Sequence, residues 1–209
     1  MKEAEVSGMG GRKSAERIRA FVALDLDAKS VRRVVRVADR LRMASGAPSA
    51  TWTPQGNVHL TLKFMADLPT GATPPLGAAL ATLVEGGKAP QLGTCRLQAF
   101  PSVEQASVVV IQLADPLGDL AKLAAKIDKL ASAHGIPRES RAFVPHVTLA
   151  RLKRPYDSQR WLIPELAEAA GELTALHLTL YRSDLGATKD GGATYVPLAS
   201  FPYGSKLGH

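Results

Sequence analysis

The chain repeats one order of expected elements twice, and this repeat limits its possible folds more than any other sequence feature. Apolar residues at alternating or helical spacing predict the elements of both units. The first unit, about residues 18–100, reads strand, helix, strand, helix, strand, at 18–26, 28–43, 59–64, near 75–85 and 92–100. The second unit, about 107–182, repeats this order at 107–115, 116–135, 146–151, near 158–170 and 173–182.

Two such units predict an α+β fold with a pseudo-twofold axis. Each unit has enough strands for a small, mostly antiparallel sheet and enough helices to cover one face of that sheet. We therefore expect two similar lobes with the functional cleft between them. The lobes should form a single domain at 17–209, and the Gly-rich, charged residues 1–16 should form a disordered tail.

The composition is typical of a soluble cytoplasmic protein. Hydrophobic residues make up 45% and charged residues 22% of the chain, as in ordinary globular proteins. No apolar run is long enough to span a membrane, and the N-terminus lacks the apolar core of a signal peptide. The single cysteine, Cys95, excludes an internal disulfide and a four-cysteine metal site. Nothing in the sequence requires more than a monomer.

The charge is unevenly distributed. The net charge of +7 is a weak sign of a polyanionic partner. Residues 136–160 are locally basic, with six cations (Arg138, Arg141, Arg151, Lys153, Arg154 and Arg160) against Glu139 and Asp157. This segment is either a solubilising surface or part of a phosphate-binding site, and the second interpretation requires catalytic residues beside its arginines.

Three of the five histidines lie in a recurring tetrapeptide: His-Leu-Thr-Leu at 59–62, His-Val-Thr-Leu at 146–149 and His-Leu-Thr-Leu at 177–180. His59 and His146 hold equivalent places in the two units, because Phe21 precedes His59 by 38 residues and Val109 precedes His146 by 37. This match makes a chance origin of the first two copies improbable.

His177 differs from the other two copies. It lies on the last strand of the second unit, and the corresponding strand of the first unit has no histidine. We expect leucines 176, 178 and 180 to form the buried face of this strand and His177 to point away from it, as a structural or surface residue.

Residues two apart on a strand face the same side. His59 therefore shares a face with Thr61, and His146 shares one with Thr148. The neighbouring apolar residues are expected to anchor the two strands in the core: Leu60, Leu62, Phe64, Val147 and Leu149. If the lobes pack around the twofold axis, both His–Thr pairs line one cleft.

Two imidazoles suit an in-line displacement at phosphorus. Near neutral pH a neutral ring can take a proton from water while a charged ring gives one to the leaving oxygen. Threonine hydroxyls can donate hydrogen bonds to the non-bridging oxygens. Zinc is the main chemical alternative, but neither motif has a further ligand at standard spacing. We therefore expect no metal and no cofactor.

The sequence resembles the two-histidine (2H) phosphoesterase superfamily, and within it the RNA 2′,3′-cyclic phosphodiesterases, also called 2′-5′ RNA ligase-like proteins. The resemblance runs from about Arg19 to Tyr203. It rests on the paired His-x-Thr-x (HXTX) motifs and on five segments: IRAFVALDLD, TWTPQGNVHLTLKF, RAFVPHVTLAR, LYRSDL and GATYVPLASFP.

The resemblance implies roles for individual residues. His59 would be the proton donor to the leaving 3′ oxygen and His146 the base that activates water. Thr61, Thr148 and Arg151 would hold the phosphate. Arg151 follows His146 by an odd number of residues, so its strand must depart from strict alternation to bring it to the cleft.

Three aromatic residues lie near the motifs or in the opening strand, and one of them is open to two interpretations. Phe143 either stacks on a nucleobase, as aromatic residues do for unpaired nucleotides, or packs in the core. Trp52 is expected to pack between the lobes. Phe21, in the opening strand, is expected to be a core residue.

The resemblance implies metal-independent hydrolysis of 2′,3′-cyclic phosphates, at RNA ends or on nucleosides, to 2′-phosphomonoesters. Two alternatives stay open. The main activity could be 2′-5′ RNA ligation, in which a 5′-hydroxyl takes the place of water. The protein could also be a catalytically idle module that binds RNA ends through the cleft and its arginines.

Overall fold

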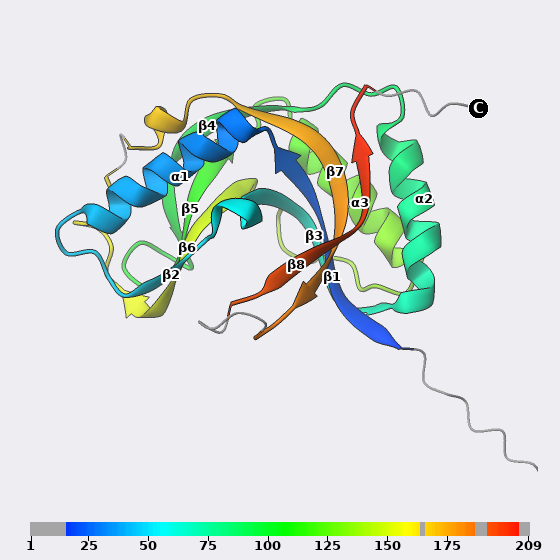
Figure 1. Cartoon of the computed structure of the whole chain (residues 1–209), viewed down its shortest axis with the longest axis horizontal. Helices are drawn as coiled ribbons and strands as arrows, with labels where there is room; N and C mark the ends of the chain where they lie inside the picture. Colours follow the sequence, from blue (N-terminus) through cyan, green and yellow to red (C-terminus); the bar gives the residue numbers. More distant parts are fainter. Residues whose placement is uncertain (1–15, 164–165, 187–191, 205–209) are drawn as a thin grey trace, which may run out of the picture.

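The computed structural model describes residues 16–163, 166–186 and 192–204. The tail predicted at 1–16 therefore lies outside the described residues except for Glu16, as do the side chains of Thr94 and Cys95. The strands are β1 (Arg17–Leu26), β2 (Ala50–Trp52), β3 (His59–Pro69), β4 (Gln91–Phe100), β5 (Ala106–Ala114), β6 (His146–Tyr156), β7 (Leu173–Asp184) and β8 (Thr194–Pro202) (Figure 1). The helices are α1 (Ala28–Met43), α2 (Thr73–Val84) and α3 (Asp119–Ser132), with short 3-10 turns η1 (Gln55–Asn57), η2 (Thr70–Ala72) and η4 (Glu168–Ala170).

The strands form two lobes. In lobe 1, β1 pairs with β3 and β7, and β7 pairs with β8. In lobe 2, β6 pairs with β2 and β5, and β5 pairs with β4. All these pairings are antiparallel, so the predicted bilobal α+β fold is confirmed. Two short pairings, β3 with β6 and β4 with β7, join the lobes.

The lobes do not correspond to the two sequence units. Strand β4 ends the first unit but pairs with β5 in lobe 2, and β7 ends the second unit but pairs with β1 in lobe 1. Each sheet is therefore built from both halves of the chain. A repeat shows how many similar units exist, but not which strands they exchange, because that choice depends on long-range pairing.

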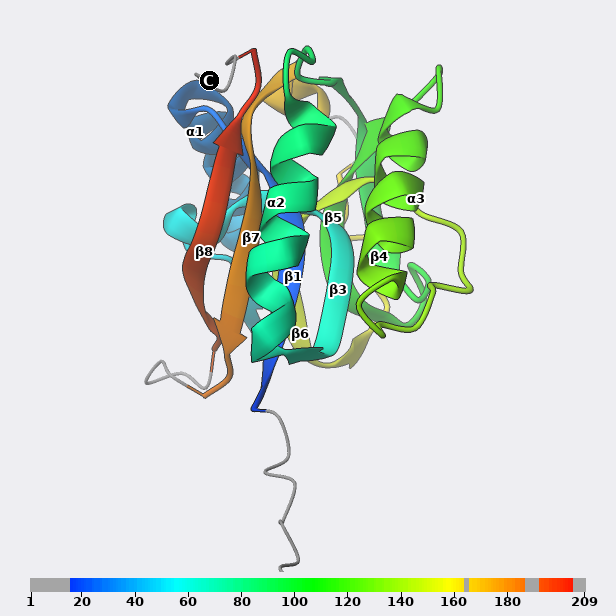
Figure 2. The same cartoon turned by 90° about the vertical axis from the view of Figure 1, so that its right-hand side faces the viewer.

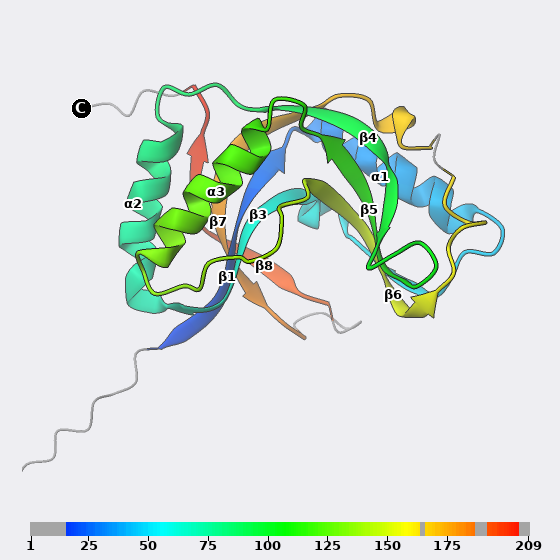
Figure 3. The same cartoon turned by 180° about the vertical axis from the view of Figure 1, so that it is seen from behind.

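The helices cover the outer faces of the two sheets, and α1 and α3 exchange places in the same way, whereas α2 stays on lobe 1. Helix α1 packs on β6 and η4, whereas α2 packs on β7 and β8 and α3 on β3. Figure 2 shows α2 in front of the lobe 1 strands. Figure 3 shows α3 beside α2, and it shows α1 behind the strands of lobe 2. Helix α1 begins where Asp27 accepts a hydrogen bond from the Ser30 N–H, and it buries Val34, Val37 and Leu41 at helical spacing.

The helix predicted near 158–170 is wrong. The described residues of this stretch form turns and the short η4. Trp161 supplies the packing there, because it is 2% exposed and its Nε1 donates to the Leu41 carbonyl of α1 over 2.9 Å. Pro164 within the stretch removes a backbone donor that a helix would need. The strands β2 and β8 were not predicted.

One buried ion pair connects the lobe 1 sheet to α3. Lys63 on β3 is 7% exposed, and its Nζ donates to Asp128 Oδ1 over 2.7 Å and to the Pro137 carbonyl over 2.8 Å. Asp128 also accepts from Arg138 Nε over 2.8 Å and from the Glu139 N–H over 3.1 Å. These bonds tie the strand of the first motif to the loop that leads into the second.

Replacing Asp128 tests the strength of this connection. Asp128→Asn should lower the free energy of unfolding by about 3 kcal/mol, because it leaves the Lys63 ammonium buried without its counter-charge. Denaturant unfolding measures the change. Asp39→Asn is the matched control, since the Asp39–Arg42 pair of α1 is exposed and should contribute less than about 1 kcal/mol. Similar small losses in both variants would contradict this account.

Candidate active site

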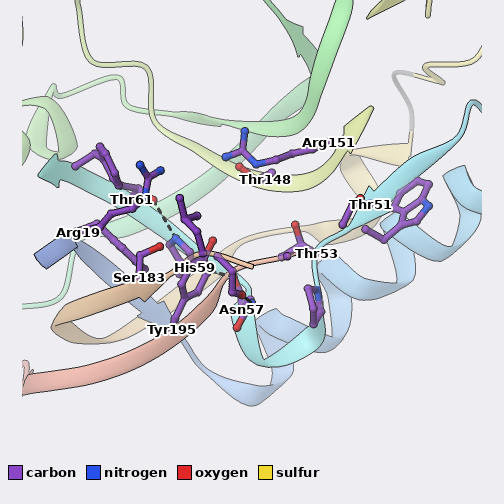
Figure 4. A pocket seen from close by; sticks show the side chains of 17 residues that line it. Arg19, Thr51, Thr53, Asn57, His59, Thr61, Thr148, Arg151, Ser183 and Tyr195 are labelled. Atoms are coloured by element: carbon purple, nitrogen blue, oxygen red, sulfur yellow. Dashed lines mark hydrogen bonds between the residues drawn. The ribbon is translucent and has the colours of Figure 1, made fainter. Parts of the chain in front are cut away.

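A pocket of about 560 Å³ opens between the lobes. Lobe 1 contributes His59, Thr61 and several neighbours, lobe 2 contributes Thr148 and Arg151, and the segment from β2 to η1 completes the wall (Figure 4). This volume is in the range of small-molecule sites. The structure thus brings four of the predicted site residues to one cavity.

Each motif histidine is oriented by the backbone carbonyl two residues before it. His59 Nδ1 lies 2.8 Å from the Asn57 oxygen, and His146 Nδ1 lies 2.7 Å from the Val144 oxygen. A carbonyl accepts but cannot donate, so both Nδ1 atoms carry hydrogen, and Nε2 is the atom that can exchange a proton. His59 Nε2 also lies 2.9 Å from Thr61 Oγ1. The two histidines are therefore held in the same way.

His146 is not among the residues that line the pocket, although its strand neighbours Thr148 and Arg151 are. Its ring packs edge-on against Phe100, with 5.3 Å between ring centroids. It is still within electrostatic range of the first motif, because a charge on His146 lowers the pKa of His59.

Both motif strands depart from strict alternation just after the motif. Beside the first motif, the pairing of β1 with β3 shifts register between Val22 and Ala23. Beside the second motif, the pairing of β5 with β6 shifts between Val109 and Val110. Two consecutive residues are buried there, 62–63 on β3 and 149–150 on β6. A bulge of this kind returns the next residue to the cleft face. Those residues are Phe64 and Arg151, and both line the pocket.

The bulges correct one prediction and explain another. Phe64 was expected in the core, but it is 40% exposed and lines the pocket. Arg151 was expected to need a departure from alternation, and the bulge supplies it. Aligning the two units would have shown that Phe64 and Arg151 are equivalent, each five residues after its histidine.

Aromatic rings surround His59. Phe21 stacks on the imidazole with 4.9 Å between ring centroids, and Tyr195 meets it edge-on at 5.4 Å. Phe21 also stacks on Tyr181 at 5.1 Å. Phe21 is 3% exposed, as expected for a core residue, yet its ring also forms part of the pocket wall. The place of Tyr195 in this cluster was not predicted, because it depends on the pairing of β8 with β7.

The environment favours neutral rings in both motifs. Burial lowers the pKa of His59, and the charges of His146 and Arg151 lower it further, against the opposing effects of the Asn57 carbonyl and the Asp25 carboxylate. Burial and Arg151 likewise lower the pKa of His146. Without a bound anion, both rings are therefore mostly neutral at pH 7.

Asp25 is the carboxylate whose charge favours a protonated His59. It is paired in register with His59 across β1 and β3, so both side chains share the cleft face. Its carboxylate accepts from Thr179 Oγ1 over 2.6 Å and from the Tyr181 hydroxyl over 2.8 Å. These two hydrogen bonds fix the orientation of the carboxylate.

Of the remaining residues discussed from the sequence, Phe143 and His177 lie outside the pocket lining, whereas Trp52 belongs to it. Phe143 is partly buried and packs against the core, so core packing accounts for its position. His177 is paired with Asp25 on the neighbouring strand and does not line the pocket. Leu176 was expected to be buried but is 44% exposed, because the register of β7 with β1 shifts there. Trp52 is partly buried, packs edge-on against Trp161 and lines the pocket.

Within the described ranges, no three His, Cys, Asp or Glu side chains are grouped so that they could hold a metal ion. In the same ranges no helix is long and apolar enough to cross a membrane. The basic segment 136–160 is partly used for structure, because Arg138 pairs with Asp128 and Arg141 with Glu139.

Removing the charge of Asp25 tests its effect on His59. Asp25→Asn should lower the pKa of His59 further, because the variant loses a negative charge that favours the imidazolium. Titration of the ring followed by NMR measures this change. The pKa of His146 is the internal control and should stay in place, since Asp25 is not among the groups that shift it. An unchanged His59 pKa would contradict the assignment.

The sequence and the fold match known proteins. The family model of the 2′-5′ RNA ligase superfamily matches residues 29–187. The RNA 2′,3′-cyclic phosphodiesterase of Aquifex aeolicus is 29% identical over 138 residues, which cover 65% of this chain and 71% of that protein. The protein of the same name from Methanothermobacter thermautotrophicus is 27% identical over 172 residues, 81% of this chain and 91% of that protein.

Solved structures show the same fold. The crystal structure of TT0787 from Thermus thermophilus matches with a TM-score of 0.70 at 22% identity, over 91% of this chain and 100% of that chain. Escherichia coli LigT in complex with 3′-AMP matches with a TM-score of 0.66 at 21% identity, over the same shares of the two chains. Because the family model covers well over half of the sequence, this chain belongs to the 2′-5′ RNA ligase superfamily.

Proposed function

We propose that this protein is a metal-independent RNA 2′,3′-cyclic phosphodiesterase that opens cyclic phosphate ends to 2′-phosphomonoesters. The observation that carries the proposal is the matched orientation of His59 and His146, each held through Nδ1 by a backbone carbonyl. The names of the curated relatives support the same reaction. The protein would need no cofactor and would act as a cytoplasmic monomer.

The reaction begins with neutral His146. Its Nε2 takes a proton from a water molecule as the water oxygen attacks phosphorus, and a new P–O bond forms. The bond from phosphorus to the 3′ oxygen breaks in line with this attack. Protonated His59 gives its Nε2 proton to that oxygen, which leaves as the 3′-hydroxyl. The product keeps its phosphate on the 2′ oxygen.

The phosphate itself prepares His59 for this role. The ring is mostly neutral in the free protein, because burial and nearby cations lower its pKa. A bound anionic phosphate raises the pKa of an adjacent histidine, so the substrate helps to protonate its own proton donor. Thr61, Thr148 and Arg151 line the same pocket and can donate hydrogen bonds to the non-bridging oxygens.

Ligation remains the second candidate, because the matching family model bears the name of the 2′-5′ RNA ligases. The same two histidines can catalyse ligation when a 5′-hydroxyl replaces water as the nucleophile: the bond from phosphorus to the 3′ oxygen breaks as before, and a 2′-5′ phosphodiester forms. Product analysis with and without a 5′-hydroxyl RNA measures the balance. A 2′-5′-linked product that outweighs the 2′-phosphomonoester would make ligation the main activity.

Substitution of the histidines tests the proposal. His59→Ala and His146→Ala should each reduce the turnover of a nucleoside 2′,3′-cyclic phosphate by about 10²–10⁴-fold, since each removes an acid–base catalyst. Far-ultraviolet circular dichroism checks that the variants are folded. The rate of the wild-type protein should persist in EDTA.

His177→Gln is the matched control. This histidine lies in the same tetrapeptide pattern but outside the pocket lining, so its replacement should leave turnover within about threefold. If His177→Gln were as severe as His146→Gln, the site would involve a different pair of strands. A wild-type protein without turnover, in which His59→Ala and His146→Ala change only the affinity for RNA ends, would instead favour the idle RNA-binding module.

A further inference from the structure

Arg19 is a cation of the pocket that the reaction above does not use. It lies on β1, it is exposed, and it lines the pocket. Its guanidinium carbon lies 4.1 Å from the centroid of the Phe64 ring. Among the described residues the Arg19 side chain makes no ion pair and no hydrogen bond, so its guanidinium donors are free for a ligand.

The stacking on Phe64 prepares Arg19 for an anion. A planar guanidinium that lies on an aromatic face loses little further freedom when it binds, and its edge still presents the donors that suit phosphate oxygens. Arg17, two residues earlier on the same strand, is different, because its Nε pairs with Asp67 over 2.7 Å and it does not line the pocket. Of these two arginines, Arg19 is the one available to substrate.

Ser183 completes a polar end of the pocket. Ala20 and Arg182 are the last residues paired between β1 and β7 at this end, and Arg19 and Ser183 directly adjoin them on the two strands. Ser183 is 6% exposed and lines the pocket. Figure 4 shows Arg19 and Ser183 on one side of His59 and Thr51 and Thr53 on the other. A guanidinium beside a hydroxyl is a suitable pair for a phosphate.

This end is separate from the position of the reactive phosphate. Arg151 stands after the bulge of β6, and Phe64 occupies the equivalent place on β3. Phe64 is three residues beyond Thr61, at most about 10 Å further along the strand at about 3.3 Å per residue. Arg151 stands equally far beyond Thr148, but its long side chain can reach back toward the threonines, whereas the Arg19 guanidinium is held over the Phe64 ring. Arg19 reaches the pocket over this ring. An anion held there is therefore a second phosphate rather than the cyclic one.

We propose that Arg19, supported by Phe64 and assisted by Ser183, binds the phosphodiester that joins the terminal nucleotide to the rest of an RNA strand. The inference rests on the proposed function and adds a substrate class to it. The pocket selects oligonucleotide ends, or nucleotides with a 5′-phosphate, over nucleoside 2′,3′-cyclic phosphates with a free 5′-hydroxyl.

The test compares kcat/KM for three substrates that carry the same terminal base. They are a nucleoside 2′,3′-cyclic phosphate, its 5′-phosphorylated form, and a dinucleotide that ends in the cyclic phosphate. The wild-type protein should prefer the second and third. Arg19→Gln should reduce both preference ratios by about tenfold or more, the usual effect of losing a charged hydrogen bond to phosphate. Arg19→Lys should keep part of the preference, because it retains the charge without the fork of donors.

Arg17→Gln is the matched control and should leave both ratios unchanged. Ratios that stay within twofold in Arg19→Gln would overturn the inference, and so would equal losses on all three substrates, which would place Arg19 at the reactive phosphate. If His59→Ala and His146→Ala had no effect on turnover, the proposed function would fail instead. Calorimetric binding of a nucleoside 2′-monophosphate with and without a 5′-phosphate, to wild type and Arg19→Gln, would then decide whether Arg19 binds the second phosphate.

Discussion

The arrangement of the site depends on one backbone pair between the two motif strands, Leu60 of β3 with Val147 of β6. Both side chains are 0% exposed. Each lies between the histidine and the threonine of its motif, and alternate residues of a strand face opposite sides. Burying this pair therefore turns both histidines and both threonines away from the core. A slip of one residue would reverse that arrangement.

The rest of the fold holds this pair in place. The lobes exchange strands and helices, so neither sheet is complete without the other half of the chain. The Lys63–Asp128 pair then links β3 to the loop that precedes β6. The bulges after the two motifs bring Phe64 and Arg151 to the cleft. Apart from the segment around η1, the chemistry is carried by strands, which position side chains more firmly than loops do.

The sequence was informative where local alternation decides the outcome. The repeat and the strand period were enough to predict that His59 and Thr61, and likewise His146 and Thr148, share a face. They could not predict the strand exchange, because pairing between distant strands has no local signature. They also placed Phe64 in the core, since an alternating pattern contains no sign of a bulge. Asp25 and Arg19 were missed for another reason: their importance comes from neighbours on other strands.

The central claim is that His59 acts as the acid and His146 as the base on one phosphate, and the pH dependence of kcat/KM tests it most directly. Both histidines have a pKa below 6.5 in the free protein, so the wild-type profile should be a bell with its maximum below pH 6.5. The rate falls at high pH as His59 loses its proton and at low pH as His146 gains one. The residual activity of His59→Ala should therefore lack the alkaline limb, and that of His146→Ala the acidic limb. A profile that keeps both limbs in either variant would contradict the account.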